Sequence, residues 1–264
     1  MRPGVFEGTI RSSELKLSAS QTTCRLCQKA AKLTNSHIIP EFVFKPLYDK
    51  KHRFRSAQLA EREWDWEQKG YREPLLCENC EQKISVWESY VSKHFFNKPL
   101  PTPVSQGHSK AIILTGLDYQ KLKLFLLSIL WRAGVAAHDF YEHVQLGRLH
   151  EERLRQMLLS ENPGLAEEYA CFICTLNLDG ARFLDFFVEP TPTRLKSHRC
   201  YRFVFSGFVF YCYVTSPPLP DSTRRLTLQP NGKLTIAETE VAEHPFLRDT
   251  FNRAKDAFAS QSWD

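Results

Sequence analysis

Cysteine and histidine residues in the first third of the chain stand at spacings that suit metal-supported chemistry. Two Cys-x-x-Cys pairs are present, Cys24 with Cys27 and Cys77 with Cys80, and His37 lies between them. Four thiolates in two such pairs can close a tetrahedral zinc site. The alternative is four buried thiols that never meet. We predict a structural Zn²⁺ at the four cysteines, which leaves His37 for other chemistry.

The residues that follow the second cysteine pair have the spacing of an amphipathic helix. Apolar residues recur there at three- and four-residue steps, at Ile84, Trp87, Val91 and Phe95. Glu81 and Glu88 are seven residues apart, close to two helical turns, so both carboxylates are expected on one stripe beside the buried face. They could bind a metal ion, although a glutamate at a helix start can simply interact with the helix dipole.

Three short segments together resemble the HNH, or ββα-metal, nuclease family. They are Cys24-x-x-Cys27, Ser36-His37-Ile38-Ile39-Pro40 and Leu76-Cys77-x-x-Cys80-Glu81. The resemblance covers residues 21–97, about a third of the chain. It implies hydrolysis of phosphodiester bonds, with the strand histidine as the general base on water and one divalent metal ion, Mg²⁺ or Mn²⁺, on the scissile phosphate.

The resemblance also assigns roles to the residues that flank the histidine. Glu81 matches the helix position that usually holds His or Asn in the family, and Ser36 stands where the family usually has Asp. Such a reaction needs a base with a pKa near neutrality and a hard cation that takes up charge on the phosphate oxygens. We therefore expect His37 to be the base and Glu81, with Ser36 and Glu88, to hold the catalytic metal.

Positive charge is concentrated near the same histidine. The whole chain carries a net charge of +5, but residues 1–58 hold eleven Lys or Arg against four Asp or Glu, a balance of +7, which leaves −2 for the remainder. A basic run can bind nucleic acid by displacing counterions from phosphates, or it can be a solvated loop. The residues that we expect to contact nucleic acid are Lys45, Lys50, Lys51, Arg53 and Arg55.

Changes in composition divide the chain into four parts. Residues 1–20 form an N-terminal extension, and residues 21–97 form the zinc-knuckle module with its predicted ββα-metal arrangement. Residues 98–109 are a proline-rich connector, and residues 110–264 are a larger accessory domain. The predicted fold class is α+β, a small nuclease-like module followed by a larger α+β region with antiparallel strands.

Periodicity locates the elements of this fold. In the first region, short strands or a hairpin are expected around residues 36–38. Beyond the connector, helices are predicted at residues 118–137, 149–160 and 245–259. Strands are predicted at residues 169–178, 182–188, 201–205 and 208–215, with a hairpin of 226–228 and 234–236 that turns at residues 230–232.

Cysteine usage indicates the compartment. The N-terminal 20 residues lack the apolar run of a secretory signal, and the longest apolar stretch, residues 203–214, is too short to span a bilayer. Metal binding in a reducing cytoplasm is therefore expected rather than a disulfide framework or a membrane protein. The other four cysteines, Cys171, Cys174, Cys200 and Cys212, are predicted to be small apolar residues of the core.

The first hypothesis is an HNH-type endonuclease with DNA as the expected substrate and RNA as the alternative. To cut both strands, an enzyme with one active site must form a homodimer or act twice. Residues 110–264 would position the substrate or bind a protein partner. Nuclease modules joined to an unrelated α+β domain resemble parts of bacterial mobile-element or phage-defence systems, an analogy at the level of the fold.

Two other hypotheses use the same residues without catalysis. One is a zinc module that binds nucleic acid or a protein, in which Ser36 in place of Asp marks lost activity. The other is an interaction protein whose zinc knuckle only braces the fold. Mutation of His37 would abolish activity under the first hypothesis only, whereas charge reversal at Lys50, Lys51 and Arg53 would weaken binding under the second.

Overall fold

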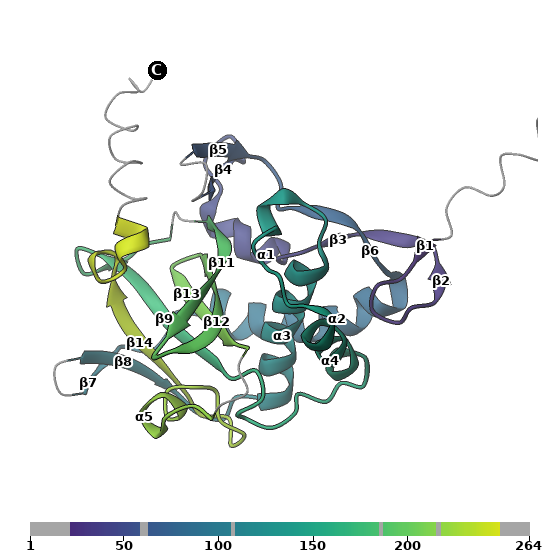
Figure 1. Ribbon diagram of the computed structural model, residues 1–264. Coiled ribbons are helices and arrows are strands. Elements are labelled where there is room, and N and C mark those ends of the chain that lie inside the picture. The colour runs from purple at the N-terminus through teal and green to yellow at the C-terminus, as the bar shows by residue number, and fades with distance from the viewer. Residues whose placement is uncertain (1–21, 59–62, 107–108, 185–186, 215–217, 249–264) are drawn as a thin grey trace, which may run out of the picture.

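The computed structural model describes residues 22–58, 63–106, 109–184, 187–214 and 218–248. The fold is α+β, as the sequence predicts. A large mixed sheet occupies one side of the molecule and the longer helices occupy the other (Figure 1). No helix among the described residues is long and apolar enough to cross a membrane.

Five α-helices are present in the described part of the chain. They are α1 (Glu41–Phe44), α2 (Glu78–Val91), α3 (Tyr119–Val135), α4 (Arg148–Leu159) and α5 (Asp221–Arg224). Helix α3 is buried along most of its length, from Leu122 to Ala133, and packs between α2 and α4. This burial explains why its sequence is apolar on nearly every side.

The largest sheet of the described residues has ten strands and joins distant parts of the chain. Its order is β5-β4-β11-β12-β13-β9-β14-β8-β7, with β10 paired to β9. The strands are β4 (Phe54–Gln58), β5 (Glu63–Glu67), β7 (Val104–Gln106), β8 (Ser109–Leu114), β9 (Cys171–Leu178), β10 (Ala181–Arg182), β11 (Phe187–Leu195), β12 (His198–Phe205), β13 (Phe208–Tyr213) and β14 (Leu234–Glu240). Strand β4 of the first region pairs in parallel with β11, at Phe187 opposite Ser56.

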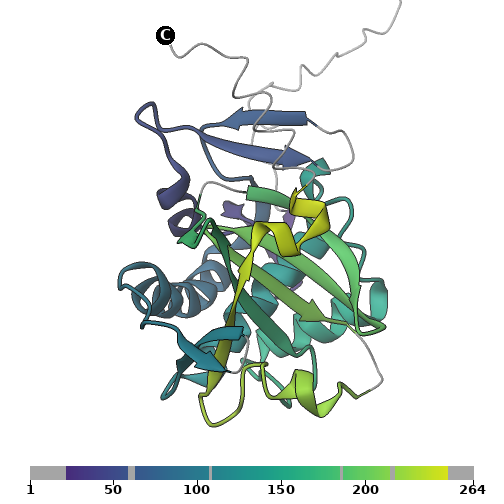
Figure 2. The same ribbon diagram turned by 90° about the vertical axis from the view of Figure 1, so that its left-hand side faces the viewer.

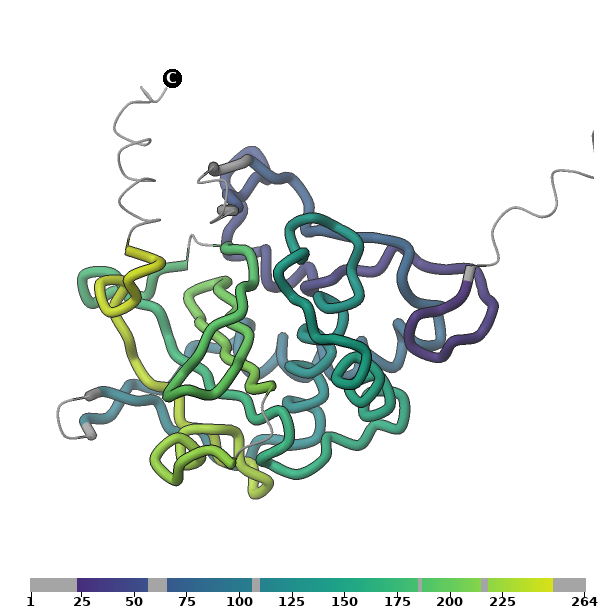
Figure 3. Tube along the Cα trace, in the orientation of Figure 1, coloured from purple at the N-terminus to yellow at the C-terminus, as the bar shows by residue number. Residues whose placement is uncertain are grey.

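Two smaller sheets lie in the cysteine-rich region. Strands β1 (Thr22–Thr23) and β2 (Ala30–Ala31) form a short antiparallel pair around the first cysteine pair. Strand β3 (Leu33–His37) pairs antiparallel with β6 (Arg72–Cys77), and α2 begins directly after β6 (Figure 3). Strands β3 and β6 and helix α2 are thus in contact near His37, with α1, β4 and β5 between β3 and β6 in the chain.

One hydrophobic core spans the predicted connector. A single cluster of buried residues includes Cys24, Ile38 and Trp87 from the first region and Trp131 and Phe187 from the second. The large sheet also joins the two regions, because β4 and β5 extend it at one end of the molecule (Figure 2). The two regions share a core, while the domain boundaries remain a prediction.

Several predicted elements are confirmed. Helix α2 buries Ile84, Trp87 and Val91, and Phe95 is buried in the π-helical turn that follows. Helices α3 and α4 and strands β9, β12 and β13 lie where periodicity places them. The four cysteines predicted to be core residues, Cys171, Cys174, Cys200 and Cys212, are all buried.

Two predictions about strand pairing are wrong. The strand predicted at 182–188 is divided between β10 and β11, and β11 continues to Leu195. The predicted hairpin of 226–228 with 234–236 does not form, because β14 pairs with β8 and β9 while Thr227 bridges to Phe172. The predicted turn at residues 230–232 does form, with the Gly232 N–H bonded to the Gln229 carbonyl at 2.9 Å. The segments on either side of it pair with distant strands, which local periodicity does not reveal. Residues 1–20 and most of the predicted helix at 245–259 lie outside the described residues.

The turn before β14 supplies a stability test. Gly232 has φ +75°, and an added Cβ would lie 2.2 Å from the Leu117 carbonyl oxygen, so Gly232→Ala would add a backbone clash to left-handed strain. We expect it to lower the free energy of unfolding by about 2–4 kcal/mol, measured by urea denaturation. The control is Gly180→Ala, where φ is +77° and an added Cβ would meet no atom within 4 Å. This substitution should lower the free energy of unfolding by about 1–2 kcal/mol, from the left-handed strain alone. Equal losses would contradict the clash.

Candidate metal centre and histidine site

The two Cys-x-x-Cys pairs meet in space. The sulfur atoms of Cys24, Cys27, Cys77 and Cys80 all lie within 4.8 Å of one another, and the Cys27 and Cys77 Sγ atoms are 3.8 Å apart. Sulfur ligands at about 2.3 Å from a tetrahedral zinc ion stand about 3.8 Å from each other. The cluster can therefore hold a metal ion such as zinc, and it is the sole group of three or more such ligand residues found among the described residues.

Backbone amides already favour a thiolate at this cluster. The Cys77 N–H donates to Cys24 Sγ at 3.3 Å. Burial opposes ionisation of Cys24, but hydrogen bonds from the Cys27 and Cys77 amides outweigh it and lower the pKa of Cys24. Burial raises the pKa of the Cys80 thiol, with its sulfur neighbours adding to the effect. A cation at the centre would remove this conflict, because it favours all four thiolates at once.

A β-bulge in β6 allows a hydrogen bond between the first cysteine pair and the β3–β6 sheet. The register between the strands shifts between Thr34 and Asn35, so that Leu75 has no partner on β3, and Pro74, which has no N–H, lies next to this bulge. The bulge leaves the Leu75 carbonyl oxygen pointing away from the ladder, where it accepts the Arg25 N–H at 3.0 Å. The sheet and the knuckle therefore hold each other in place.

Helix α4 braces the same knuckle from the second region. Arg155, which is almost fully buried, donates from Nη1 to the Leu26 carbonyl oxygen at 2.7 Å and forms an ion pair with Glu152. Lys83 of α2 donates to the Leu159 carbonyl oxygen at 2.9 Å. These contacts connect α4 to the first cysteine pair and to α2, the helix that carries Cys80.

His37 lies at the end of β3 beside a carboxylate that the sequence analysis did not identify. Its Nε2 is 2.9 Å from Oε2 of Glu41, which also accepts from Arg72 Nη2 at 3.1 Å. The other Glu41 oxygen accepts from the Tyr48 hydroxyl at 2.7 Å. Pro40 is the N-cap of α1 and directly follows the buried pair Ile38–Ile39. The chain turns there, so the side chain of Glu41 comes back to that of His37, four residues earlier.

The protonation states at this cluster follow from its contacts. Burial opposes ionisation of Glu41, but hydrogen bonds from Tyr48, His37 and Arg72 prevail and hold its pKa below the usual value. Burial, together with the positive charge of Arg72, lowers the pKa of His37 below its usual value near 6.5. At neutral pH the site thus contains a neutral imidazole beside an ionised carboxylate.

Ser36 and Glu81, predicted as metal ligands, contact the backbone and side chains of the β3–β6 sheet. The Ser36 hydroxyl is buried, accepts the Leu76 N–H at 3.1 Å and donates weakly to the Thr34 carbonyl at 3.4 Å. Because neighbouring strand residues face opposite sides, Ser36 and His37 do not share a face. Glu81 Oε1 accepts from the Thr34 hydroxyl at 3.3 Å.

Glu88 contacts a buried arginine from α3. Arg132 Nη2 lies 2.9 Å from Glu88 Oε1, an ion pair whose angles do not form an aligned hydrogen bond. The same guanidinium donates from Nη1 to the His37 carbonyl oxygen at 2.8 Å. Arg132 therefore links the predicted carboxylate to the backbone of the predicted base.

The predicted nucleic-acid contacts lie on the loop after α1 and on the β4–β5 hairpin. Lys45, Lys50 and Lys51 are exposed. The guanidinium carbons of Arg53 and Arg55 lie 4.2 and 4.3 Å from the ring centre of Trp66, which is 45% exposed. Asp49 also pairs with Arg53 at 2.9 Å. Arg53 and Arg55 thus lie against the same ring, and the charge of Arg53 is partly neutralised by Asp49.

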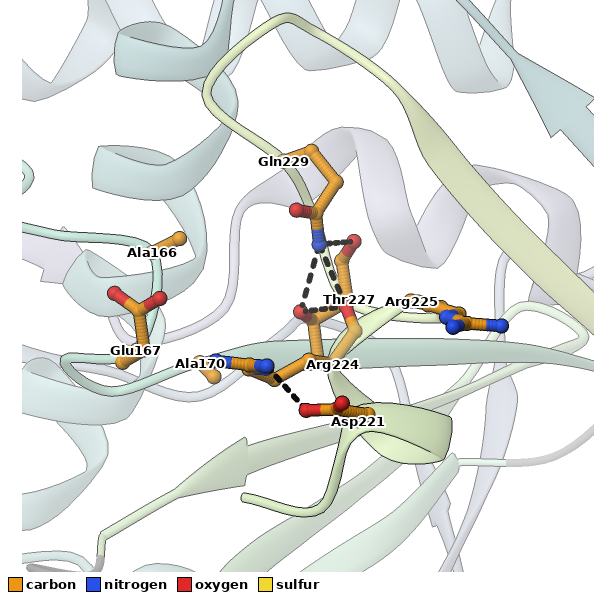
Figure 4. A pocket seen from close by; sticks show the side chains of 8 residues that line it. All are labelled: Ala166, Glu167, Ala170, Asp221, Arg224, Arg225, Thr227 and Gln229. Atoms are coloured by element: carbon orange, nitrogen blue, oxygen red, sulfur yellow. Dashed lines mark hydrogen bonds and ion pairs between the residues drawn. The ribbon is translucent and has the colours of Figure 1, made fainter. Parts of the chain in front are cut away.

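A surface pocket of about 320 Å³ lies elsewhere, near α5 (Figure 4). It shares no residue with the cysteine cluster or with the groups around His37. Figure 4 shows that Gln229 is held by the Thr227 hydroxyl and the Arg224 carbonyl, and that Arg224 pairs with Asp221. These polar groups satisfy one another, and the pocket adds nothing to the chemistry of His37.

Four residues of the site were not predicted from the sequence, and three of them had a partial signal in it. Glu41 stands four residues after His37, and Tyr48 follows in the same basic segment. Arg72 opposes His37 in the strand pairing, which cannot be read without the register. Arg132 is a charged residue in the apolar second half of α3, a pattern that indicates a buried partner.

The opposing effects of two neighbours on the His37 pKa can be measured. Arg72→Gln is expected to raise the His37 pKa, and Glu41→Gln is expected to lower it further, followed by NMR titration of the imidazole. A lowered folded-state pKa means that the unfolded chain binds more protons below about pH 6.5, so the His37 contribution to stability is lost as the pH falls through that range. Shifts of the opposite signs would contradict the contacts described.

Comparison with known proteins assigns no family to this geometry. No protein-family model, curated protein or solved structure matches the chain.

Proposed function

We propose that this chain hydrolyses phosphodiester bonds in nucleic acid, DNA in the first instance, with His37 as the general base. One observation carries the proposal, the contact between His37 Nε2 and the Glu41 carboxylate at 2.9 Å. The antiparallel β3–β6 pair with α2 directly after β6 supports the resemblance to HNH nucleases, although α1, β4 and β5 are inserted between the two strands.

The His37–Glu41 contact decides which ring nitrogen can act. An ionised Glu41 only accepts hydrogen bonds, so Nε2 carries the proton of the neutral imidazole. Nδ1 then has a free lone pair, and no hydrogen bond to it is found within the described part of the chain. A carboxylate that fixes the tautomer of a catalytic histidine in this way also stabilises the imidazolium formed after proton transfer.

Positive charge beside the histidine suits an anionic substrate. Arg72 lies opposite His37 in the strand pairing, and its side chain is 32% exposed. Its guanidinium can contact a phosphate oxygen while it retains the bond to Glu41. The lysines of the loop after α1, Lys45, Lys50 and Lys51, would extend the contact along the backbone without reading bases.

The residues near His37 do not form a complete protein site for Mg²⁺ or Mn²⁺. The Ser36 hydroxyl is buried and bonded to the strand backbone, and Glu88 pairs with Arg132. Glu81 retains a carboxylate oxygen beyond its contact with Thr34. The oxygen donors present therefore do not fit a dedicated divalent-cation site. A metal requirement stays a prediction of the resemblance.

For the cysteine cluster, the proposal includes a structural zinc. Purified protein should contain one zinc per chain, measured by mass spectrometry of the metal, and Cys77→Ser should lose most of it. Removal of zinc with a chelator should lower the unfolding temperature, since the metal binds only the folded arrangement of thiolates. Cys174→Ala, which removes a buried cysteine outside the cluster, should keep the metal. Full zinc content in Cys77→Ser would refute the site.

Cleavage of supercoiled plasmid tests the reaction. Wild-type protein with Mg²⁺ or Mn²⁺ should nick or linearise the plasmid, and His37→Ala with unchanged zinc content should reduce the rate by about 100-fold or more, the usual contribution of a general base. Arg72→Ala should reduce it less, because it removes one charge contact and leaves the base.

The matched control is His143→Ala, which removes a surface histidine beside Glu142. It should cleave at the wild-type rate. Equal activity of His37→Ala and the wild type would exclude His37 as the base. No cleavage of plasmid, single-stranded DNA or RNA under any metal condition would reject hydrolysis by the isolated chain.

The exposed basic residues favour a second candidate, a zinc module that binds nucleic acid without cutting it. Ser36 replaces the usual Asp and is committed to the strand backbone, which is the specific observation behind this alternative. Under it, charge reversal at Lys50 and Lys51 would weaken DNA binding and reduce its salt dependence, whereas His37→Ala would change neither.

A further inference from the structure

We infer that Arg132 is the positioning residue for His37. The inference rests on the proposed function for its catalytic consequence, but the contact itself is a feature of this fold. Arg132 comes from α3, far along the chain, and only 1% of its side chain is exposed. It is therefore too buried to touch a substrate, and its effect must pass through the groups that it holds.

The His37 carbonyl, at the end of β3, needs a hydrogen-bond donor from outside the sheet. Strand β3 pairs with β6 on one edge only, so carbonyl groups on its outer edge have no strand partner. The N–H of Ile38 is bonded to the Tyr71 carbonyl at 3.1 Å on the β6 side. Arg132 Nη1 supplies the outer bond, to the His37 carbonyl at 2.8 Å. The peptide that carries the imidazole is thus held from both sides.

The guanidinium is itself fixed by three groups. Its Nε and Nη2 atoms donate to the backbone oxygen and hydroxyl of Ser128 at 3.3 and 3.2 Å. Glu88 supplies the negative charge that a buried guanidinium requires. The planar guanidinium of Arg132 contacts Glu88 and the His37 carbonyl at the same time. A lysine ammonium is a point charge and cannot reproduce this geometry.

The end of the same helix holds the second strand. The Ala137 N–H, just past α3, donates to both carboxylate oxygens of Glu73 at 3.0 Å. Glu73 is the residue of β6 opposite Ser36. One helix end therefore contacts both strands that frame His37, and it fixes the position of the pair relative to α3.

Steady-state kinetics on a labelled oligonucleotide duplex separate positioning from folding. Arg132→Lys should lower kcat about 10- to 100-fold with KM changed by less than about twofold, because a small misplacement of a base slows the chemical step and leaves binding intact. The double variant Glu88→Met/Arg132→Met replaces the ion pair by apolar side chains. It should be more stable than a variant that removes only one partner of the pair, while its kcat stays low.

Arg155 provides the matched control, since it is also buried, pairs with a nearby glutamate and donates to a backbone carbonyl, that of Leu26. Arg155→Gln should lose stability and keep kcat. Wild-type kcat in the double variant, or an equal fall of kcat in Arg155→Gln, would overturn the inference.

A second readout does not depend on cleavage. The side-chain carbon and proton resonances of His37 should move in Arg132→Lys and stay in place in Arg155→Gln. If the wild type cleaves no nucleic acid, the proposed function fails, and these spectra still decide whether Arg132 positions His37. Unchanged His37 resonances in Arg132→Lys would overturn the inference.

Discussion

Four sulfur atoms within 4.8 Å of one another are the constraint on which the His37 site depends. They bring together residues 50 apart in the chain, such as Cys27 and Cys77. Cys77 also pairs with Leu33 at the start of the β3–β6 ladder, so the cluster sets the register of both strands. A slip of one residue would exchange the faces of Ser36 and His37 and bury the imidazole.

Two buried arginines connect the second region to the first, one at the cysteine knuckle and one at the histidine site. Arg155 of α4 reaches the Leu26 carbonyl in the knuckle, and Arg132 of α3 reaches the His37 carbonyl at the end of β3. Loss of either helix would leave these backbone oxygens without their donors. The accessory region therefore takes part in forming the histidine site through Arg132. Its contact with the first region is more than a packing interface.

The sequence predicted what short-range patterns encode. The spacing of Cys24, Cys27, Cys77 and Cys80 and the periodicity of α2, α3 and α4 were sufficient to place these elements. Pairings between distant strands were not predictable, since the contacts of β14 with β8 and β9 depend on which apolar strands meet in the core. Glu41 was missed because its role depends on the turn at Pro40, which brings it back to His37.

Glu88 shows why spacing alone does not assign a role to a carboxylate. Its place on α2, two turns after Glu81, suits a metal ligand and a counter-ion equally well. The choice depends on the charge that faces it, and Arg132, which supplies that charge, lies 44 residues further along the chain. A buried guanidinium without its partner would be costly, so a metal ion could take Glu88 only if Arg132 moved. Because Arg132 also holds the His37 carbonyl, such a movement would release the base.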